Sequence, residues 1–137
     1  MGCQFYLERL SQLRKIKIIE TRDANPKLSI PKRKELEAAS LEAKLSAKDY
    51  PIILDMHGQT FSSEELASYL QELDHKSALI PTFIIGGPFG LDQSLISKAR
   101  CLISLSNLTF THELARLLLL EQIYRAQCIL NHLPYHH

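Results

Sequence analysis

Short apolar runs alternate with helical patterns along this chain, and that order constrains the fold more than any other feature. PIILDM (51–56) is a continuous apolar run, as expected for a buried strand of a parallel sheet. Two further strands are expected in ALIPTFIIGG, where the strand ends at Gly86, and in CLISLS (101–106). The segment KIKIIE (15–20) alternates and is β-branched, which predicts another strand. Strands that alternate with helices predict an α/β fold with a mostly parallel sheet and flanking helices.

Helical spacing fills the intervals between these runs. Ser62 and Glu65 form a capping box at one helix start, and Thr111 is a good N-cap at another. We expect helices over residues 4–13, 32–47, 62–74, 92–100 and 111–130, with a polar loop over residues 21–31.

The last of these helices is apolar on every side around Leu117–Leu120, with Leu114, Ile123 and Ile129 adding to the pattern. A helix that is apolar all round is buried all round. Because a small domain has little interior, we expect this helix to pack at a subunit interface; the alternative is an ordinary core helix.

Composition indicates one domain over residues 1–137 and narrows the function classes. The net charge of +1 is low for a protein that binds naked RNA by electrostatics alone. Three widely spaced cysteines without a C-x-x-C pair favour neither disulfides nor zinc and suit a reducing cytoplasm. No apolar run approaches the ~20 residues of a membrane span, and MGCQFYLERL is charged too early for a signal peptide.

The strand that ends at Gly86 runs directly into a turn with three glycines and a proline, Gly86-Gly87-Pro88-Phe89-Gly90. Ligands of open α/β sheets bind at the carboxyl ends of strands, and glycine lets backbone groups approach a ligand closely. Neither the phosphate-loop motif nor the dinucleotide motif is present, which disfavours a metabolic nucleotide-binding enzyme. Taken alone, the turn fits a ligand loop and a plain tight turn equally well.

Four segments together resemble one family: GGPFG (86–90), LSNLTFTHELAR (105–116), EQIYRA (121–126) and the terminal PYH (134–136). They are similar to the ribosomal large-subunit pseudouridine methyltransferase H family of the SPOUT, or α/β-knot, methyltransferases. The resemblance covers nearly the whole chain, and the combination is more specific than any of its parts. It implies a sheet whose C-terminal part forms a trefoil knot, a homodimer, and S-adenosyl-L-methionine as cofactor.

In that family three loops hold the cofactor, and each has a counterpart here. The first follows the strand that ends at Leu54 and continues through Asp55-Met56-His57-Gly58. The second is the glycine turn, and the third is the segment 105–110. The resemblance thus implies cofactor contacts for Leu54, Gly86, Gly87, Leu105, Ser106, Asn107, Leu108, Thr109 and Phe110. Leucines would line an apolar slot for adenine. Leu54 and Leu105 suit a plain core position equally well.

The implied reaction transfers a methyl group to N3 of a pseudouridine in 23S rRNA of assembled 70S ribosomes. The sulfonium donor is already activated, so the chemistry needs no metal and no covalent intermediate; it needs alignment and removal of the N3 proton. The absence of an appended RNA-binding segment and the near-neutral charge fit recognition of an assembled particle.

The resemblance places catalytic residues in the last helix and the tail. Tyr135 and His136 match the family's terminal Tyr-His: Tyr135 would stack on a base, and His136 would take the proton or orient a phosphate. Arg125 and His112 are further catalytic candidates, and Arg116 is a candidate for substrate phosphate or the dimer interface. The simpler alternatives are local hydrogen bonding for His112, an i, i+4 ion pair of Arg125 with Glu121, and a disordered tail.

Two departures from the family stand out. Thr111 occupies a position that is usually Pro, and we expect the helix start to survive because Thr caps helices well. Family chains also begin with an apolar strand and a glycine turn upstream of the segment that Tyr6–Arg9 matches, and this chain lacks that strand. We expect the start to be called too late; the alternative is a shortened form with uncovered sheet edges.

Two rival functions remain. One is a SPOUT methyltransferase with another RNA target such as tRNA, which Tyr135-His136 disfavours. The other is a truncated, non-catalytic dimeric paralogue, whose only support is the missing strand. Binding of S-adenosyl-L-methionine distinguishes the two, because an enzyme must bind it and a non-catalytic paralogue need not.

Overall fold

A computed structural model describes residues 2–137 and confirms the parallel α/β architecture. The strands are β1 (Asp49–Thr60), β2 (Ile80–Ile84) and β3 (Cys101–Ser104), and they form a parallel sheet in the order β2-β1-β3. The helices are α1 (Gly2–Leu10), α2 (Ile30–Glu42), α3 (Ser63–Lys76), α4 (Gln93–Ile96) and α5 (His112–Leu130).

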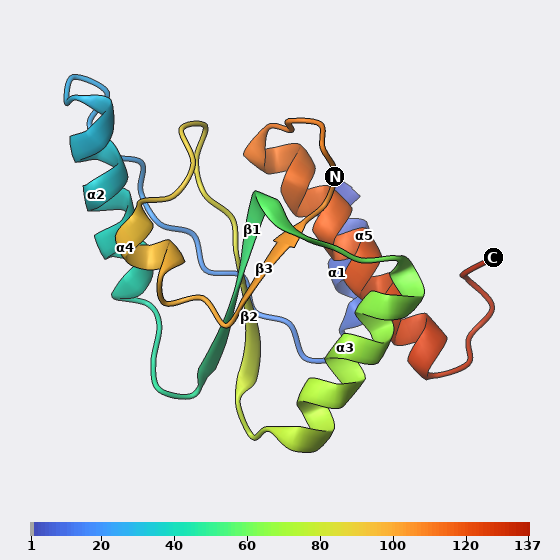
Figure 1. Cartoon of the computed structure of the whole chain (residues 1–137). Coiled ribbons are helices and arrows are strands. Elements are labelled where there is room, and N and C mark those ends of the chain that lie inside the picture. The colour runs from blue at the N-terminus through green and yellow to red at the C-terminus, as the bar shows by residue number, and fades with distance from the viewer. Residues whose placement is uncertain (1) are drawn as a thin grey trace.

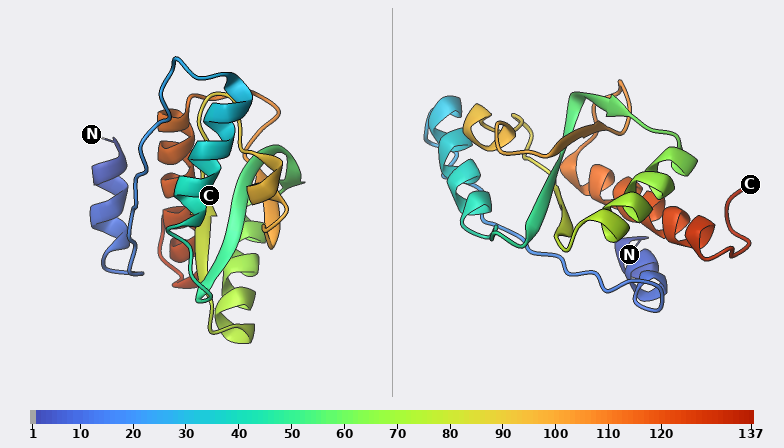
Figure 2. Two further views of the ribbon diagram at one scale, coloured as in Figure 1. Left: turned by 90° about the vertical axis from the view of Figure 1, so that its left-hand side faces the viewer. Right: turned by 60° about the horizontal axis from the view of Figure 1, so that its bottom comes forward.

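Helices cover both faces of this sheet, so the molecule has three layers (Figures 1 and 2). Ile53 and Ile84 point to one face and pack with Ala38 of α2 and Leu95 of α4. Ile52 and Ile103 point to the other face, where α3 and α5 bury them. Burial on both faces explains why these strands read as continuous apolar runs.

An irregularity in β1 bends the strand over β3. The β1–β3 register runs from Ile52↔Cys101 to Leu54↔Ile103, then resumes at Gln59↔Ile103 after an interruption. A Cβ at Gly58 would lie 2.5 Å from the carbonyl carbon of Leu102, so only glycine fits where the two backbones cross.

The strand predicted at KIKIIE is wrong: residues 15–20 form no regular secondary structure. A strand needs a neighbour for its backbone groups, and within residues 2–137 β2 pairs with β1 alone. Ile16 packs into the core, whereas Ile18 and Ile19 are 39% and 49% exposed and Ile80 on β2 is 57% exposed. The alternating pattern is present, but none of the strands in residues 2–137 pairs with it.

Local signals located the helix starts well. The Ser62–Glu65 capping box is formed, and Thr111 Oγ1 accepts a hydrogen bond from the backbone N–H of Leu114. The predicted 92–100 helix is shorter than expected and covers only Gln93–Ile96. The predicted 32–47 helix begins two residues earlier and ends at Glu42.

The final helix α5 packs on α3 and on α1. Leu119, Leu120 and Ile123 are buried in this packing, so that part of α5 is an ordinary core helix. Leu118 is half-buried and belongs to none of the three core clusters. The expected subunit interface stays a prediction. Within the described chain, no helix combines the length and the apolar character needed to cross a membrane.

Candidate active site

The three segments expected to hold a cofactor lie at one edge of the sheet, but the first, residues 55–58, is the irregular part of β1 and not a loop that follows a strand ending at Leu54. All three strands are parallel, so the chain leaves them at the same edge. Figure 1 shows the bend of β1, the turn after β2 and the loop between β3 and α5 at the top of the molecule. This edge is where open α/β sheets bind ligands.

The glycine turn after β2 is closed by a hydrogen bond from Gly90 N–H to the carbonyl oxygen of Gly87, at 3.0 Å. Gly90 has φ +80°, in the left-handed region that favours glycine. A Cβ at Gly86 would lie 2.7 Å from Cγ of the buried Leu91, so the turn packs tightly on its inner side.

The loop after β3 is held by short local hydrogen bonds. Ser104 Oγ donates to the carbonyl oxygen of Ser106 at 3.0 Å, and Ser106 Oγ accepts from the N–H of Leu108 at 3.0 Å. Leu108 projects from this ordered loop with 70% of its surface exposed, while Leu105 and Phe110 are half-buried. Asn107 and Thr109 are exposed, so their side chains are available to a ligand.

These residues fit S-adenosyl-L-methionine in part. A Cβ at Gly90 would meet nothing within 4 Å, so the turn is open at that residue, and Leu108 is an exposed apolar group that could face an adenine ring. Leu54 is different, because it packs against the cluster of Leu10, Leu119, Leu120 and Ile123 and therefore has a core role in this structure.

His112 and Arg116 lie at the start of α5, near the proposed cofactor loop. His112 Nε2 is 3.4 Å from Oε1 of its neighbour Glu113, which matches the expected local contact at a helix start. Arg116 donates to Glu20 Oε1 at 2.9 Å and is about one-third exposed. Within residues 2–137, neither side chain forms a hydrogen bond or ion pair with the tail residues.

The C-terminal tail folds back onto the helices. The Tyr135 hydroxyl donates to Glu121 Oε1 at 3.0 Å and lies 3.4 Å from the Tyr6 hydroxyl. Its ring packs edge-on against Tyr124, with centroids 4.8 Å apart. Burial, with the hydrogen bonds to Tyr6 and Glu121, raises the pKa of Tyr135, so this phenol stays neutral at physiological pH. The expectation that a free tail is disordered does not apply here.

Arg125 joins the tail to the helix. Its Nε and Nη2 donate to Glu121 Oε1 at 3.0 and 2.5 Å, which confirms the i, i+4 ion pair, and Glu121 raises the pKa of the guanidinium. Its Nη1 lies 3.1 Å from Nδ1 of His136, and its guanidinium carbon lies 4.8 Å from the centroid of the Tyr135 ring. His136 Nε2 contacts Glu64 Oε1 of α3 at 2.6 Å. The structure therefore gathers Arg125, Tyr135 and His136.

Two of these partners could not be found from sequence spacing. Glu64 is 72 positions from His136, and Tyr6 is 129 positions from Tyr135. The sequence placed Glu64 at a helix start and Tyr6 in a helical pattern that also matches a segment of the family, so no local signal linked either residue to the tail.

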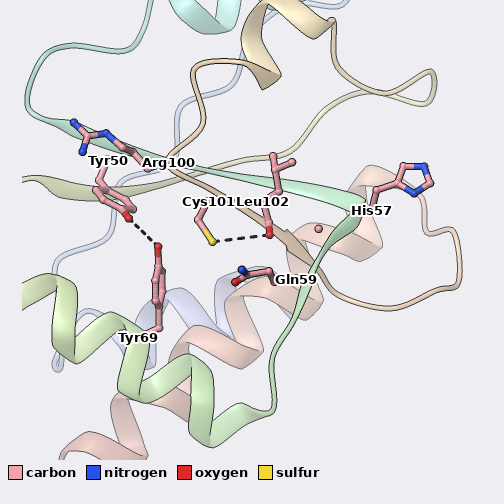
Figure 3. Close-up of a pocket in the computed structure, with 8 residues that line it drawn as sticks. Tyr50, His57, Gln59, Tyr69, Arg100, Cys101 and Leu102 are labelled. Carbon is pink, nitrogen blue, oxygen red and sulfur yellow. Dashed lines mark hydrogen bonds between the residues drawn. The ribbon is translucent and has the colours of Figure 1, made fainter.

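A hollow of about 510 Å³ lies beside β3 and the bent part of β1 (Figure 3). In it the hydroxyls of Tyr50 and Tyr69 are 2.9 Å apart, and Arg100 lies 5.6 Å over the Tyr50 ring. Burial, with the hydrogen bond from Tyr50, raises the pKa of Tyr69. The lining of this hollow includes His57 and Gly58 of the first segment expected to hold the cofactor, and none of the residues expected in the other two segments or the tail. Among residues 2–137, no three His, Cys, Asp or Glu side chains are grouped so as to hold a metal ion.

Comparison with known proteins decides the family. The family model described as "Predicted SPOUT methyltransferase" matches residues 1–136. The chain is a SPOUT methyltransferase. It is 43% identical to "Ribosomal RNA large subunit methyltransferase H" of Lawsonia intracellularis over 136 residues, which cover 99% of this chain and 87% of that protein. The protein of the same name from Desulforamulus reducens is 41% identical over 140 residues, covering 98% and 88%. The SPOUT methyltransferase described here thus belongs to the methyltransferase H family, as its motifs indicated.

Proposed function

We propose that this methyltransferase uses S-adenosyl-L-methionine to methylate N3 of a pseudouridine in 23S rRNA, acting as a homodimer on assembled 70S ribosomes in the cytoplasm. The observation that carries the proposal is the cluster of Arg125, Tyr135 and His136 in a chain whose relatives are named as large-subunit rRNA methyltransferases. A non-catalytic scaffold would not need this cluster.

The glycine turn and the loop over residues 105–110 are the parts of the chain that would hold the cofactor. Backbone groups near Gly86 and in the 105–110 loop would read the adenine edge, with Leu108 against the ring. When bound, the cofactor supplies a methyl group on a positively charged sulfur. We include the family's trefoil knot in the proposal, because it would fix these loops against each other.

The protein's own task in the reaction is to position the base and to remove a proton. The N3 nitrogen of the ring is a poor nucleophile until it loses its proton, so a base such as His136 is required nearby. Tyr135 offers an aromatic face for the flat base, and Arg125 offers a fixed positive charge for a phosphate or for the developing negative charge.

Geometry along α5 supports a dimer. His112 and Arg125 are 13 positions apart on one helix, which at 1.5 Å per residue places them about 20 Å apart along its axis. Figure 1 and the right-hand view of Figure 2 place the C-terminus far from the turn after β2. A tail that acts at the methyl group of the cofactor would therefore come from a second copy of the chain.

The test is incubation of the chain with tritiated S-adenosyl-L-methionine and 70S ribosomes from a strain that lacks this methylation. Free 23S rRNA and fully methylated ribosomes serve as parallel substrates. Label that enters rRNA only in unmethylated ribosomes, with the product identified as N3-methylpseudouridine by mass spectrometry of nucleosides, supports the proposal. Label in tRNA instead, or cofactor binding without transfer to any RNA, contradicts it.

A further inference from the structure

Positive charge is concentrated in one part of this nearly neutral protein. Residues 14–48 contain ten Lys and Arg against five Asp and Glu, whereas the rest of the chain contains six against ten. The low net charge of +1 therefore hides a basic segment and an acidic remainder. The net charge of the whole chain therefore describes neither the basic segment nor the acidic remainder.

The few acidic groups in the basic segment are largely occupied. Glu20 pairs with Arg116, Glu42 pairs with Lys98, and Glu37 accepts a hydrogen bond from the backbone N–H of Ala24 at 3.1 Å. In contrast, several cations have no carboxylate within 4.0 Å among residues 2–137; these are Lys15, Lys17, Arg22, Lys27, Lys34, Lys44 and Lys48. Their charge is available to a partner.

Part of this charge borders the glycine turn. We call the cations of the loop before α2 and of its first turns the basic rim: Arg22, Lys27, Lys32, Arg33 and Lys34. The Arg33 guanidinium lies 4.6 Å over the ring of Phe89 in the glycine turn, and its buried Nε has no hydrogen-bond partner. A Cβ on Gly87 would lie 3.3 Å from Glu37 of the same helix. Arg33 of the rim and Glu37 of the same helix therefore adjoin the turn.

Helix stability does not explain this arrangement. Lys32 and Arg33 are in the first turn of α2, which has no acidic residue. Cations at that end oppose the helix dipole, which favours negative charge there. Their presence costs some helix stability, so a role outside the helix is the better explanation.

We propose that the basic rim binds the phosphate backbone of rRNA next to the nucleotide that is methylated. This inference rests on the proposed function, because a base that reaches the cofactor beside the glycine turn brings its flanking phosphates to the rim. Lysine contacts to phosphates position a strand without reading its sequence. That suits an enzyme that leaves target selection to the shape of the assembled particle.

The experiment compares two charge-matched variants of the full chain. Lys27→Gln/Lys32→Gln removes two exposed charges of the rim, and Lys44→Gln/Lys48→Gln removes two exposed charges beyond the other end of α2. Lys32 and Lys44 are about 18 Å apart by helical rise. Binding to unmethylated 70S ribosomes is measured by co-sedimentation at several salt concentrations, beside cofactor affinity and the methyl-transfer rate.

The rim variant should bind ribosomes roughly tenfold more weakly at low salt. The slope of its log affinity against log salt concentration should also be shallower, by the equivalent of about two phosphate contacts. Its cofactor affinity should be unchanged, and the control variant should bind like the wild type. Equal losses of ribosome binding in both variants, or no loss in the rim variant, would overturn the inference. Co-sedimentation with phosphatidylglycerol vesicles is a further comparison: a rim variant that loses binding to these vesicles but not to ribosomes would also overturn it.

Failure of the proposed function gives a different pattern. A wild-type chain that co-sediments with ribosomes but transfers no methyl group would sink the proposed reaction, while the two variants would still test the rim. A wild-type chain that does not bind ribosomes at any salt concentration would overturn the rim assignment directly.

Discussion

Nη1 of Arg125 lies 3.1 Å from Nδ1 of His136. Since a guanidinium has only donors, Nδ1 must be the unprotonated nitrogen that accepts, and Nε2–H then donates to Glu64 at 2.6 Å. Both ring nitrogens are therefore occupied in the docked tail. His136 can accept a substrate proton only after its contact with Arg125 opens, so the docked tail is a resting position.

Replacing His136 with Gln should lower the methyl-transfer rate by about 100-fold or more, because the base that removes the N3 proton is lost. Cofactor affinity, measured by isothermal titration calorimetry, should stay within twofold. His137→Gln is the matched control, since His137 is exposed and makes none of the tail contacts. A loss of cofactor affinity in the His136 variant would remove His136 from the substrate role.

Docking of the tail should depend on pH through Glu64. The hydrogen bond from His136 lowers the pKa of this carboxyl below its ordinary value of 4.5. A carboxyl with a lowered pKa contributes its full stabilisation above pH 4.5 and loses it as the pH falls through the lowered pKa. The backbone amide signal of His136, followed by NMR from pH 7 to pH 3, should therefore move toward its free-peptide position at the acid end.

Glu64→Gln isolates this effect, because Glu121 remains in both proteins as the other carboxylate of the cluster. The variant should show a smaller change of the His136 signal below pH 4.5 than the wild type. Identical curves for the two proteins would mean that Glu64 does not hold the tail in solution.

A side chain at Gly86 should block the cofactor. Gly86→Val should weaken binding of S-adenosyl-L-methionine at least tenfold, since a branched side chain would crowd the backbone of the turn that the cofactor is proposed to approach. Its Cβ would also press on Leu91 at 2.7 Å, so distortion of the turn must be separated from obstruction. Leu91→Ala loosens the same packing without entering the turn. An equal loss of affinity in Leu91→Ala would attribute the effect to distortion.

Sequence patterns located the parts of the fold that depend on neighbours in the chain. The strand before the glycine turn, the Ser62–Glu65 capping box and the Thr111 cap are all local, and all three are present. KIKIIE failed because a strand depends on a partner that its own pattern does not contain. The docked tail was likewise out of reach, because its partners Glu64 and Tyr6 come from other helices.

The crossing of β1 and β3 gives a prediction on stability. Gly58→Ala places a methyl group 2.5 Å from the backbone of Leu102, where no side chain can move aside. We expect the free energy of unfolding to fall by about 2–3 kcal/mol. Urea denaturation followed by circular dichroism measures it. Gly87→Ala is the control, because its added methyl meets only the flexible end of Glu37 at 3.3 Å, and it should change stability little.

The last prediction concerns Leu118 on α5, which is half-buried but joins no core cluster. If this face meets a second copy, Leu118→Glu buries an unpaired charge in the interface and should give monomers. Sedimentation equilibrium should then report the chain mass of 15.6 kDa for the variant and twice that mass for the wild type. Leu36→Glu, at an exposed leucine of α2 in the opposite layer, should remain dimeric. Because the tail and the cofactor loops are about 20 Å apart along α5 within one chain, the folded monomer should also lose methyl transfer. A persistent dimer would reject the interface, and an active monomer would reject the shared site.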